Sequence, residues 1–298
     1  MGSYWSKPSQ SVQQIPNIDP KMGYGYATLP ENILAALQRF RATMRENLTG
    51  RLPLLEAYTF TDCPTEGFKQ RINKDGVETA KVWLLPVDNP NGKGKSHHWV
   101  DNSDFIIIRD FLLSTLGAVC DAHKVPTLRT RCIALNYYPP KSDADPLNPV
   151  FPYHTDFGYI NSLISDGPTM ILDPADGKWK EIELGNRMML QVGGAMQAIK
   201  PEYKAIPHGV GKAPVIADGL GKISIGCFMD PTGPMVLTKD HRQLNAAPTI
   251  TLDAAEYIRL RFKATHESDK LTEAEQAVYN NYLAQLDDFP RPTAENLA

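Results

Sequence analysis

The segment Tyr153-His154-Thr155-Asp156 contains two residues whose types and spacing suit a metal ion. On an extended strand, residues two apart point to the same face, so the imidazole of His154 and the carboxylate of Asp156 would converge on one point. The simpler interpretation is a strand end with a solvated histidine and an aspartate that starts a turn. His-x-Asp pairs are common by chance, so a metal site requires a third ligand elsewhere in the chain.

His208 is the candidate for the third ligand. It lies in the segment Ala205-Ile-Pro-His-Gly-Val210, after a strand-like run at 196–199. Antiparallel strands return often enough to bring such a residue back beside the first pair. Two histidines and one carboxylate on one face form the facial triad of non-haem Fe(II) oxygenases, which leaves coordination positions open. A cation and a hydroxyl follow, again two apart, in Lys222-Ile-Ser224. The order of these pieces carries the prediction, rather than any one of them.

The segments that must position these residues have a sequence pattern typical of β-strands. Short apolar runs alternate with turn residues, and we expect strands at 132–138, 160–164, 169–172, 179–182, 188–192, 196–199 and 222–228. Many short strands at this spacing indicate a sandwich or barrel. Further strands are expected at 57–61 and 80–85.

Helices are expected on both sides of this β region. One is predicted at 30–48, with Pro30 in its first turn, and another over 105–123 with Ser103 as N-cap. Two more follow at the end of the chain, where Asp253 with Glu256 and Thr272 with Glu275 have capping-box spacing. We expect 1–298 to be a single domain. Residues 1–128 would supply an N-terminal arm, helices and supporting strands, 129–231 the β core, and 232–298 the terminal helices.

The composition excludes several classes of partner. The chain has 298 residues and a formal net charge of −3, and its Lys and Arg residues are scattered without a basic block. This gives no reason to expect a nucleic-acid partner or an anionic membrane surface. The four cysteines are widely spaced, which is typical of buried thiols in a reducing compartment. No apolar run suits a signal peptide or a membrane span, so we expect a cytoplasmic protein. No feature sets an oligomeric state.

In their order, these segments resemble the iron(II)/2-oxoglutarate-dependent oxygenases, in the branch that includes isopenicillin N synthase and plant flavonoid oxygenases. The resemblance covers roughly residues 131–231, about a third of the chain. The matching segments are Asn136-Tyr-Tyr-Pro139, His154-Thr-Asp156, Gly177-Lys-Trp179, His208-Gly-Val210 for the family's His-Arg-Val, and Lys222-Ile-Ser224 for its Arg-x-Ser. Gly193-Gly194-Ala-Met-Gln197 resembles the family's Gly-Asp-x-x-Gln, with Gly194 in place of the Asp.

This resemblance implies a fold and a set of roles. The fold class would be mainly β with flanking helices, built on a double-stranded β-helix or jelly-roll core. His154, Asp156 and His208 would be the metal ligands and the catalytic centre. Lys222 and Ser224 would hold the far carboxylate of 2-oxoglutarate. Tyr138 would donate its hydroxyl to the cosubstrate, and Asn136 would help at the metal-side carboxylate.

Two features depart from the family. Lys222 replaces an Arg and binds a carboxylate as a point charge, without the bidentate fork, although other branches of the superfamily use Lys. The spacing from His208 to Lys222 is also longer than usual, which implies an inserted loop at 211–221. Pocket-lining candidates are aromatic, although aromatics in a β core more often only pack: Trp83, Trp99, Phe151, Tyr153 and Phe228.

The predicted function is oxidation of a small-molecule metabolite, such as one of secondary metabolism, using Fe(II), 2-oxoglutarate and dioxygen. The outcome would be hydroxylation, desaturation or cyclisation. One alternative is an oxidase of the isopenicillin N synthase kind, which uses dioxygen without 2-oxoglutarate and in which Lys222 would hold the substrate's carboxylate. A second alternative is a non-catalytic jelly-roll binding protein.

Overall fold

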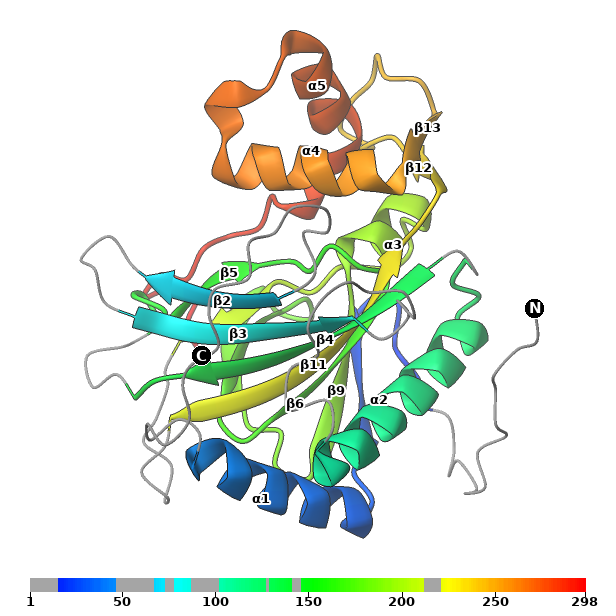
Figure 1. The fold of residues 1–298 in the computed structure, drawn as a ribbon. Coiled ribbons are helices and arrows are strands. Elements are labelled where there is room, and N and C mark those ends of the chain that lie inside the picture. Colours follow the sequence, from blue (N-terminus) through cyan, green and yellow to red (C-terminus); the bar gives the residue numbers. More distant parts are fainter. Residues whose placement is uncertain are drawn as a thin grey trace, which may run out of the picture.

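Two antiparallel β-sheets form the centre of the computed structural model, which describes residues 16–46, 67–72, 78–86, 102–126, 129–140, 146–211 and 221–298 (Figure 1). The larger sheet has the strand order β1 (Tyr24–Thr28), β9 (Arg187–Val192), β6 (Ile160–Ser165), β11 (Lys222–Pro231), β4 (Arg129–Tyr138), β3 (Glu78–Pro86) and β2 (Gly67–Ile72). The smaller sheet has the order β5 (Phe151–His154), β10 (His208–Val210), β7 (Thr169–Asp173) and β8 (Lys178–Ile182). This architecture confirms the predicted double-stranded β-helix with flanking helices.

Two N-terminal helices cover one face of the larger sheet. The helices α1 (Glu31–Glu46) and α2 (Ser103–Ala122) pack against each other, and α2 also contacts β6 and β11 (Figure 1). The apolar side chains of Ile33, Phe40, Phe105 and Leu112 meet Ile225 of β11 in one buried core. The strand β11 lies between β4 and β6 and is buried along most of its length. Its apolar residues Ile223, Ile225, Cys227 and Met229 alternate with Lys222, Ser224 and Gly226, so its two faces differ in character.

The N-terminus of α2 differs from the prediction by one residue. Asn102, and not Ser103, is the N-cap, and its side chain accepts a hydrogen bond from the backbone N–H of Phe105. Both residue types cap well, so the local sequence could not discriminate between them. Within the helical stretch 30–48, α1 begins at Glu31. Residues 47 and 48 lie outside the described ranges, as do the predicted strand at 57–61, Trp99 and most of the predicted loop at 211–221.

The predicted strand at 196–199 is wrong. These residues belong to a short helix, α3 (Gly194–Ile199), whose Ala195, Met196 and Ala198 are buried. A short, fully buried apolar run does not show whether it is helical or extended, because periodicity is unreadable over so few residues. The helix begins directly after β9 and closes over the segment that follows β5.

The C-terminal region is helical, as predicted, and packs against the end of the β core that carries α3 (Figure 1). A hairpin of β12 (Pro234–Thr238) and β13 (Thr249–Asp253) leads into α4 (Ala254–His266), where the side chain of Asp253 caps the backbone N–H of Ala255. A 3₁₀ turn (Ser268–Lys270) precedes α5 (Glu273–Val278), which has the predicted capping box of Thr272 and Glu275. The chain continues through a π-helical turn (Tyr279–Leu283) and a second 3₁₀ turn (Ala284–Leu286).

None of the helices in the described ranges has the length and apolar character that crossing a membrane requires.

Candidate metal centre

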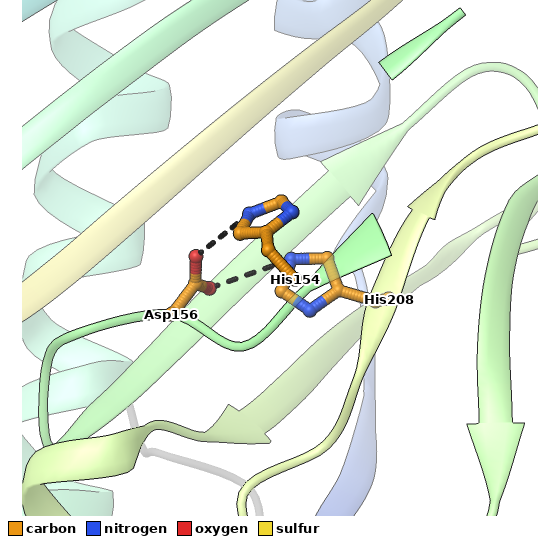
Figure 2. Close-up of side chains that lie close together, drawn as sticks. All are labelled: His154, Asp156 and His208. Atoms are coloured by element: carbon orange, nitrogen blue, oxygen red, sulfur yellow. Dashed lines mark ion pairs between the residues drawn. The ribbon is translucent and has the colours of Figure 1, made fainter. Parts of the chain in front are cut away.

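His154, Asp156 and His208 meet at the edge of the smaller sheet (Figure 2). His154 is the last residue of β5, and the antiparallel register of β5 with β10 places His208 directly opposite it. Asp156 follows two residues later. Its Oδ1 lies 3.4 Å from Nε2 of His154, and its Oδ2 lies 3.6 Å from Nε2 of His208. One potential ligand atom from each residue lies within 4.8 Å of the other two.

The orientation of both imidazoles is fixed by the same kind of contact. Nδ1 of His154 lies 2.8 Å from the carbonyl oxygen of Pro152, and Nδ1 of His208 lies 3.1 Å from that of Ile206. A carbonyl can only accept, so each Nδ1 carries the hydrogen, and in a neutral ring Nε2 then keeps its lone pair. Two Nε2 lone pairs and a carboxylate therefore face one another, an arrangement that a shared cation stabilises.

The charge states also suit a metal ion. Burial raises the pKa of Asp156, but His208, His154 and a hydrogen bond from Asn161 outweigh it and hold the pKa at about 2. The Asn161 amide donates to Oδ2 over 2.8 Å. Burial lowers the pKa of His208, although the charge of Asp156 opposes this. A carboxylate and a neutral imidazole are the forms that bind metals, and this donor set fits Fe(II).

A second polar group lies between the two sheets, where β4 and β11 pair. The register places Lys222 opposite Tyr138 and Ser224 opposite Asn136, so the four residues predicted to bind the cosubstrate occupy adjacent positions. The amide of Asn136 donates to Oγ of Ser224 over 3.3 Å. Nζ of Lys222 lies 5.7 Å from the centre of the Tyr138 ring.

Lys222 is a buried cation with neutral hydrogen-bond partners. The residue is 1% exposed, and its Nζ donates to the carbonyl oxygen of Pro168 and, over 3.0 Å, to Oγ1 of Thr169. Burial lowers the pKa of its ammonium to about 7, against the opposing charges of Glu183 and Glu181. Thr169 begins β7 of the smaller sheet, so Lys222 bridges the two sheets. Sequence reasoning missed Thr169, and only its place at the start of a predicted strand marked it.

Two of the aromatic candidates, Phe151 and Tyr153, make different contacts. The ring of Phe151 lies 5.1 Å from that of His154 and 5.9 Å from that of Tyr138, which places it between the metal-ligand candidates and the Lys222 group. Tyr153 instead packs at 4.3 Å on Trp179, and its hydroxyl donates to the carbonyl of Pro146. Tyr153 therefore belongs to a separate apolar cluster with Met170 and Trp179.

Comparison with known proteins agrees with this geometry. Residues 129–231 match the model of the 2OG-Fe(II) oxygenase superfamily. No curated protein sequence is significantly similar to the chain.

Three solved structures illustrate the similarity of the fold. The rice dioxygenase for auxin oxidation has 16% sequence identity and a TM-score of 0.58, over 83% of this chain and 87% of that one. A Neurospora crassa protein in complex with alpha-KG has 16% identity and a TM-score of 0.59, over 82% and 87%. A putative 2OG-Fe(II) oxygenase family protein from Caulobacter crescentus has 17% identity and a TM-score of 0.55, over 83% and 91%. The predicted resemblance is confirmed for the superfamily, and the branch stays a prediction.

Proposed function

We propose that this chain, whose residues 129–231 match the 2OG-Fe(II) oxygenase superfamily, is an Fe(II)- and 2-oxoglutarate-dependent oxygenase that oxidises a small molecule. One observation carries the proposal. His154, Asp156 and His208 converge with both Nδ1 atoms engaged by backbone carbonyls, so that the free donor atoms face one another. The three residues would hold Fe(II) from one side, which is the arrangement that leaves coordination positions for other ligands in centres of this kind.

The position of Lys222 supports 2-oxoglutarate as the cosubstrate. Among the described residues, the hydrogen-bond partners of the Lys222 ammonium are neutral oxygens. A buried ammonium with such partners carries a large desolvation cost, which an anionic ligand offsets. Lys222 is also close enough to His208 for its charge to lower the pKa of that imidazole. We assign the far carboxylate of 2-oxoglutarate to Lys222, Thr169 and Ser224, with Tyr138 and Asn136 beside them.

Bound Fe(II) and 2-oxoglutarate supply the oxidising chemistry by coupling reduction of dioxygen to decarboxylation of the 2-oxo acid to succinate. The chain's residues contribute orientation and exclusion of water. The carboxylate of Asp156 stays ionised because the neighbouring imidazoles and Asn161 stabilise its charge. Phe151 packs against the ring of His154 and separates it from Tyr138.

The solved neighbours indicate the size of the substrate. The Neurospora crassa protein was crystallised with alpha-KG and thymine and with alpha-KG and 5-formyluracil, and JOX2 with 2OG, Fe and JA. These ligands are small molecules, and we propose a substrate of that class for this chain. Hydroxylation, desaturation and cyclisation all follow from the same attack on a C–H bond, so the product depends on how the substrate is held.

The test is an anaerobic titration with Fe(II) and 2-oxoglutarate, followed by admission of oxygen. We expect a weak visible charge-transfer band from 2-oxoglutarate bound to Fe(II). After oxygen is admitted, succinate should form slowly even in the absence of substrate. The matched control is His208→Ala, which removes one ligand from the centre. Iron binding without the band and without succinate would instead support the oxidase that needs no 2-oxoglutarate. No metal binding would support a binding protein.

A further inference from the structure

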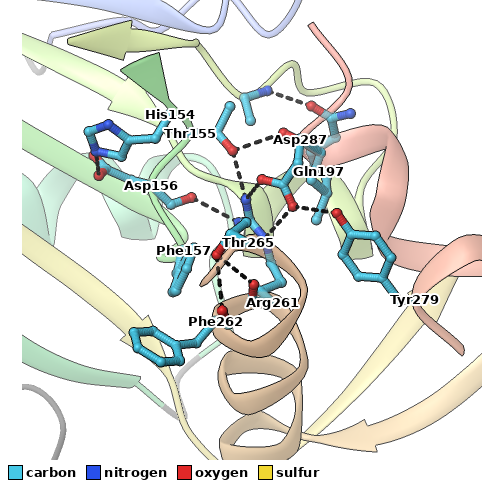
Figure 3. A network of polar contacts seen from close by, with 12 residues as sticks. His154, Thr155, Asp156, Phe157, Gln197, Arg261, Phe262, Thr265, Tyr279 and Asp287 are labelled. Atoms are coloured by element: carbon cyan, nitrogen blue, oxygen red, sulfur yellow. Dashed lines mark hydrogen bonds and ion pairs between the residues drawn. The ribbon is translucent and has the colours of Figure 1, made fainter. Parts of the chain in front are cut away.

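The guanidinium of Arg261 lies directly behind the segment that carries His154 and Asp156 (Figure 3). Arg261 belongs to α4 and is fully buried. Its Nη2 donates to Oγ1 of Thr155 over 2.8 Å, and its Nη1 donates to the backbone carbonyl of Asp156 over 3.3 Å. Thr155 is the residue between the two proposed ligands. One side chain from the C-terminal region therefore binds both the middle residue and the second ligand's backbone.

The charge of Arg261 is compensated within the same region. Its guanidinium forms an ion pair with Asp287, which also accepts a hydrogen bond of 3.1 Å from the hydroxyl of Tyr279. The guanidinium carbon lies 4.5 Å from the centre of the Phe157 ring. A buried cation costs least when it is paired with a carboxylate and its donors are satisfied. Arg261 meets both conditions, and two of its hydrogen bonds go to Thr155 and to the backbone of Asp156.

Further hydrogen bonds from the C-terminal region reach three consecutive residues, Thr155 to Phe157. Thr155 is buried, and its hydroxyl donates to the carbonyl of Leu286 over 2.9 Å while it accepts from Arg261. The hydroxyl of Tyr257, one turn before Arg261 on α4, donates to the carbonyl of Phe157 over 3.0 Å. The backbone from Thr155 to Phe157 is thus fixed from the side of α4, opposite to the face on which the two ligands converge.

The glycine at position 194 fits the same explanation. The oxygenase resemblance predicts an Asp there, and this chain has Gly194 at the start of α3. A Cβ on Gly194 would overlap Nη1 of Arg261 and would approach the hydroxyl of Tyr257 to 3.0 Å. The Gly194 N–H donates to the same Asp156 carbonyl over 2.7 Å. The departure from the family pattern and the buried guanidinium therefore occur together.

We propose that Arg261 is a positioning residue for the metal centre, acting through the Thr155 hydroxyl and the Asp156 carbonyl to hold His154 and Asp156 at the separation that binds the ion. The inference rests on the proposed function, because it takes His154 and Asp156 as metal ligands. Groups behind the ligands of a metal site typically change its affinity by about 10–100-fold. A loosened Thr155 backbone would move both ligands, since they are its neighbours on either side.

The experiment measures Co(II) binding to the full chain by its visible absorption bands, with urea unfolding of the metal-free protein alongside. Thr155→Val keeps the shape of the side chain and removes the hydroxyl, while Arg261→Lys keeps the charge beside Asp287 and removes the fork. The matched control is Tyr282→Phe, which deletes a hydroxyl hydrogen bond of 3.1 Å to the carbonyl of Ala247 in the same C-terminal region without contacting Thr155.

We expect Thr155→Val and Arg261→Lys each to raise the Co(II) dissociation constant by about 10-fold or more and to change the shape of the absorption bands. Tyr282→Phe should lower stability and leave both metal readouts as in wild type. The double variant should lose less affinity than the two single losses combined, because both changes break the same contact. Should Arg261→Lys not fold, Thr155→Val alone decides the question.

Two failures are distinguishable. The first failure is a Thr155→Val variant that loses as much unfolding free energy as Tyr282→Phe but binds Co(II) with the wild-type dissociation constant. This result would overturn the positioning role and leave the metal site intact. If the wild-type chain does not bind Co(II), or binds it equally well after His208→Ala, the proposed function itself fails, and the positioning role fails with it.

Discussion

Replacing Lys222 by Met should have opposite effects on stability and on cosubstrate binding. Met has a similar length and volume, so the change removes the charge without opening a large cavity. If Lys222 is retained in order to bind the anion, the metal-free, cosubstrate-free protein should become more stable at pH 6 while 2-oxoglutarate binding is lost. If Lys222 had a purely structural role, Lys222→Met would instead lower the stability of the protein and leave 2-oxoglutarate binding unchanged.

The size of the stability effect follows from the pKa of Lys222. Burial lowers this pKa from 10.5 to about 7. A pKa difference of about 3.5 corresponds to a cost of about 5 kcal/mol for the charged form, as an upper bound. Lys222→Met removes this cost but leaves the Pro168 carbonyl and the Thr169 hydroxyl without their donor, at about 1–3 kcal/mol each. The sum of these terms ranges from a loss of about 1 kcal/mol to a gain of about 3 kcal/mol, so we expect a net gain of about 1 kcal/mol at pH 6.

The pH dependence of this gain has a defined sign. The folded-state pKa of Lys222 lies below its unfolded value, so the unfolded chain binds more protons between about pH 7 and pH 10.5. The unfolding free energy of wild type therefore rises with pH in this window as the penalty is relieved. The advantage of Lys222→Met should be largest below pH 7 and should shrink towards pH 9.

Cosubstrate binding should change in the opposite direction. Deleting one partner of a buried charged pair costs about 2–4 kcal/mol, so Lys222→Met should raise the 2-oxoglutarate dissociation constant by roughly 30–1000-fold. Binding requires the protonated amine, so the wild-type dissociation constant should rise as pH increases above about 7. Lys222→Arg should also bind more weakly, because the bulkier fork fits a lysine-sized space poorly, but it should lose this pH dependence.

The assays are urea unfolding at pH 6 and pH 9 and calorimetric titration of 2-oxoglutarate with a redox-inert divalent ion. Lys200→Met is the matched control, because the Lys200 amine also donates to backbone carbonyls, those of His123 and Lys124, but lies in another part of the fold. The control should lose stability and keep cosubstrate affinity. Equal 2-oxoglutarate affinity in Lys222→Met and wild type would refute the reasoning and favour an oxidase in which Lys222 binds the substrate.

Four further variants test the metal centre and the Lys222 site. His154→Ala and His208→Ala should each abolish turnover with an unchanged far-ultraviolet circular dichroism spectrum, because each removes one of three ligands; wild-type turnover in either variant would contradict the assignment. Asp156→Gly should lose turnover, because it removes the carboxylate ligand and leaves an open coordination position. Substrate-free succinate formation measures the loss of turnover, and full activity would contradict the ligand role of Asp156. Thr169→Val should raise the 2-oxoglutarate dissociation constant by about 5–10-fold through loss of one hydrogen bond to the Lys222 site, and an unchanged value in titration would place the cosubstrate elsewhere.

Much of the candidate site was predictable because its geometry is local or follows the strand pattern. His154 and Asp156 converge because residues two apart on extended backbone share a face, a property that needs no tertiary information. The strands around Lys222 were predictable from their apolar runs. The short helix at Gly194 was not, since a buried run of six residues carries no readable period. The N-cap of α2 also differed, because Asn102 and Ser103 are equally good caps.

The tertiary structure decided which distant residues meet. His208 lies opposite His154 only because β5 and β10 pair in one register, and a shift by one residue would turn its imidazole to the other face. Thr169 reaches Lys222 because the two sheets close on each other, and Arg261 reaches Thr155 because α4 packs behind the segment that follows β5. Neither contact could be predicted from the spacing of residues in the sequence. Strand alternation is set by the backbone of neighbouring residues, whereas register and docking are set by how all the buried side chains fit together at once.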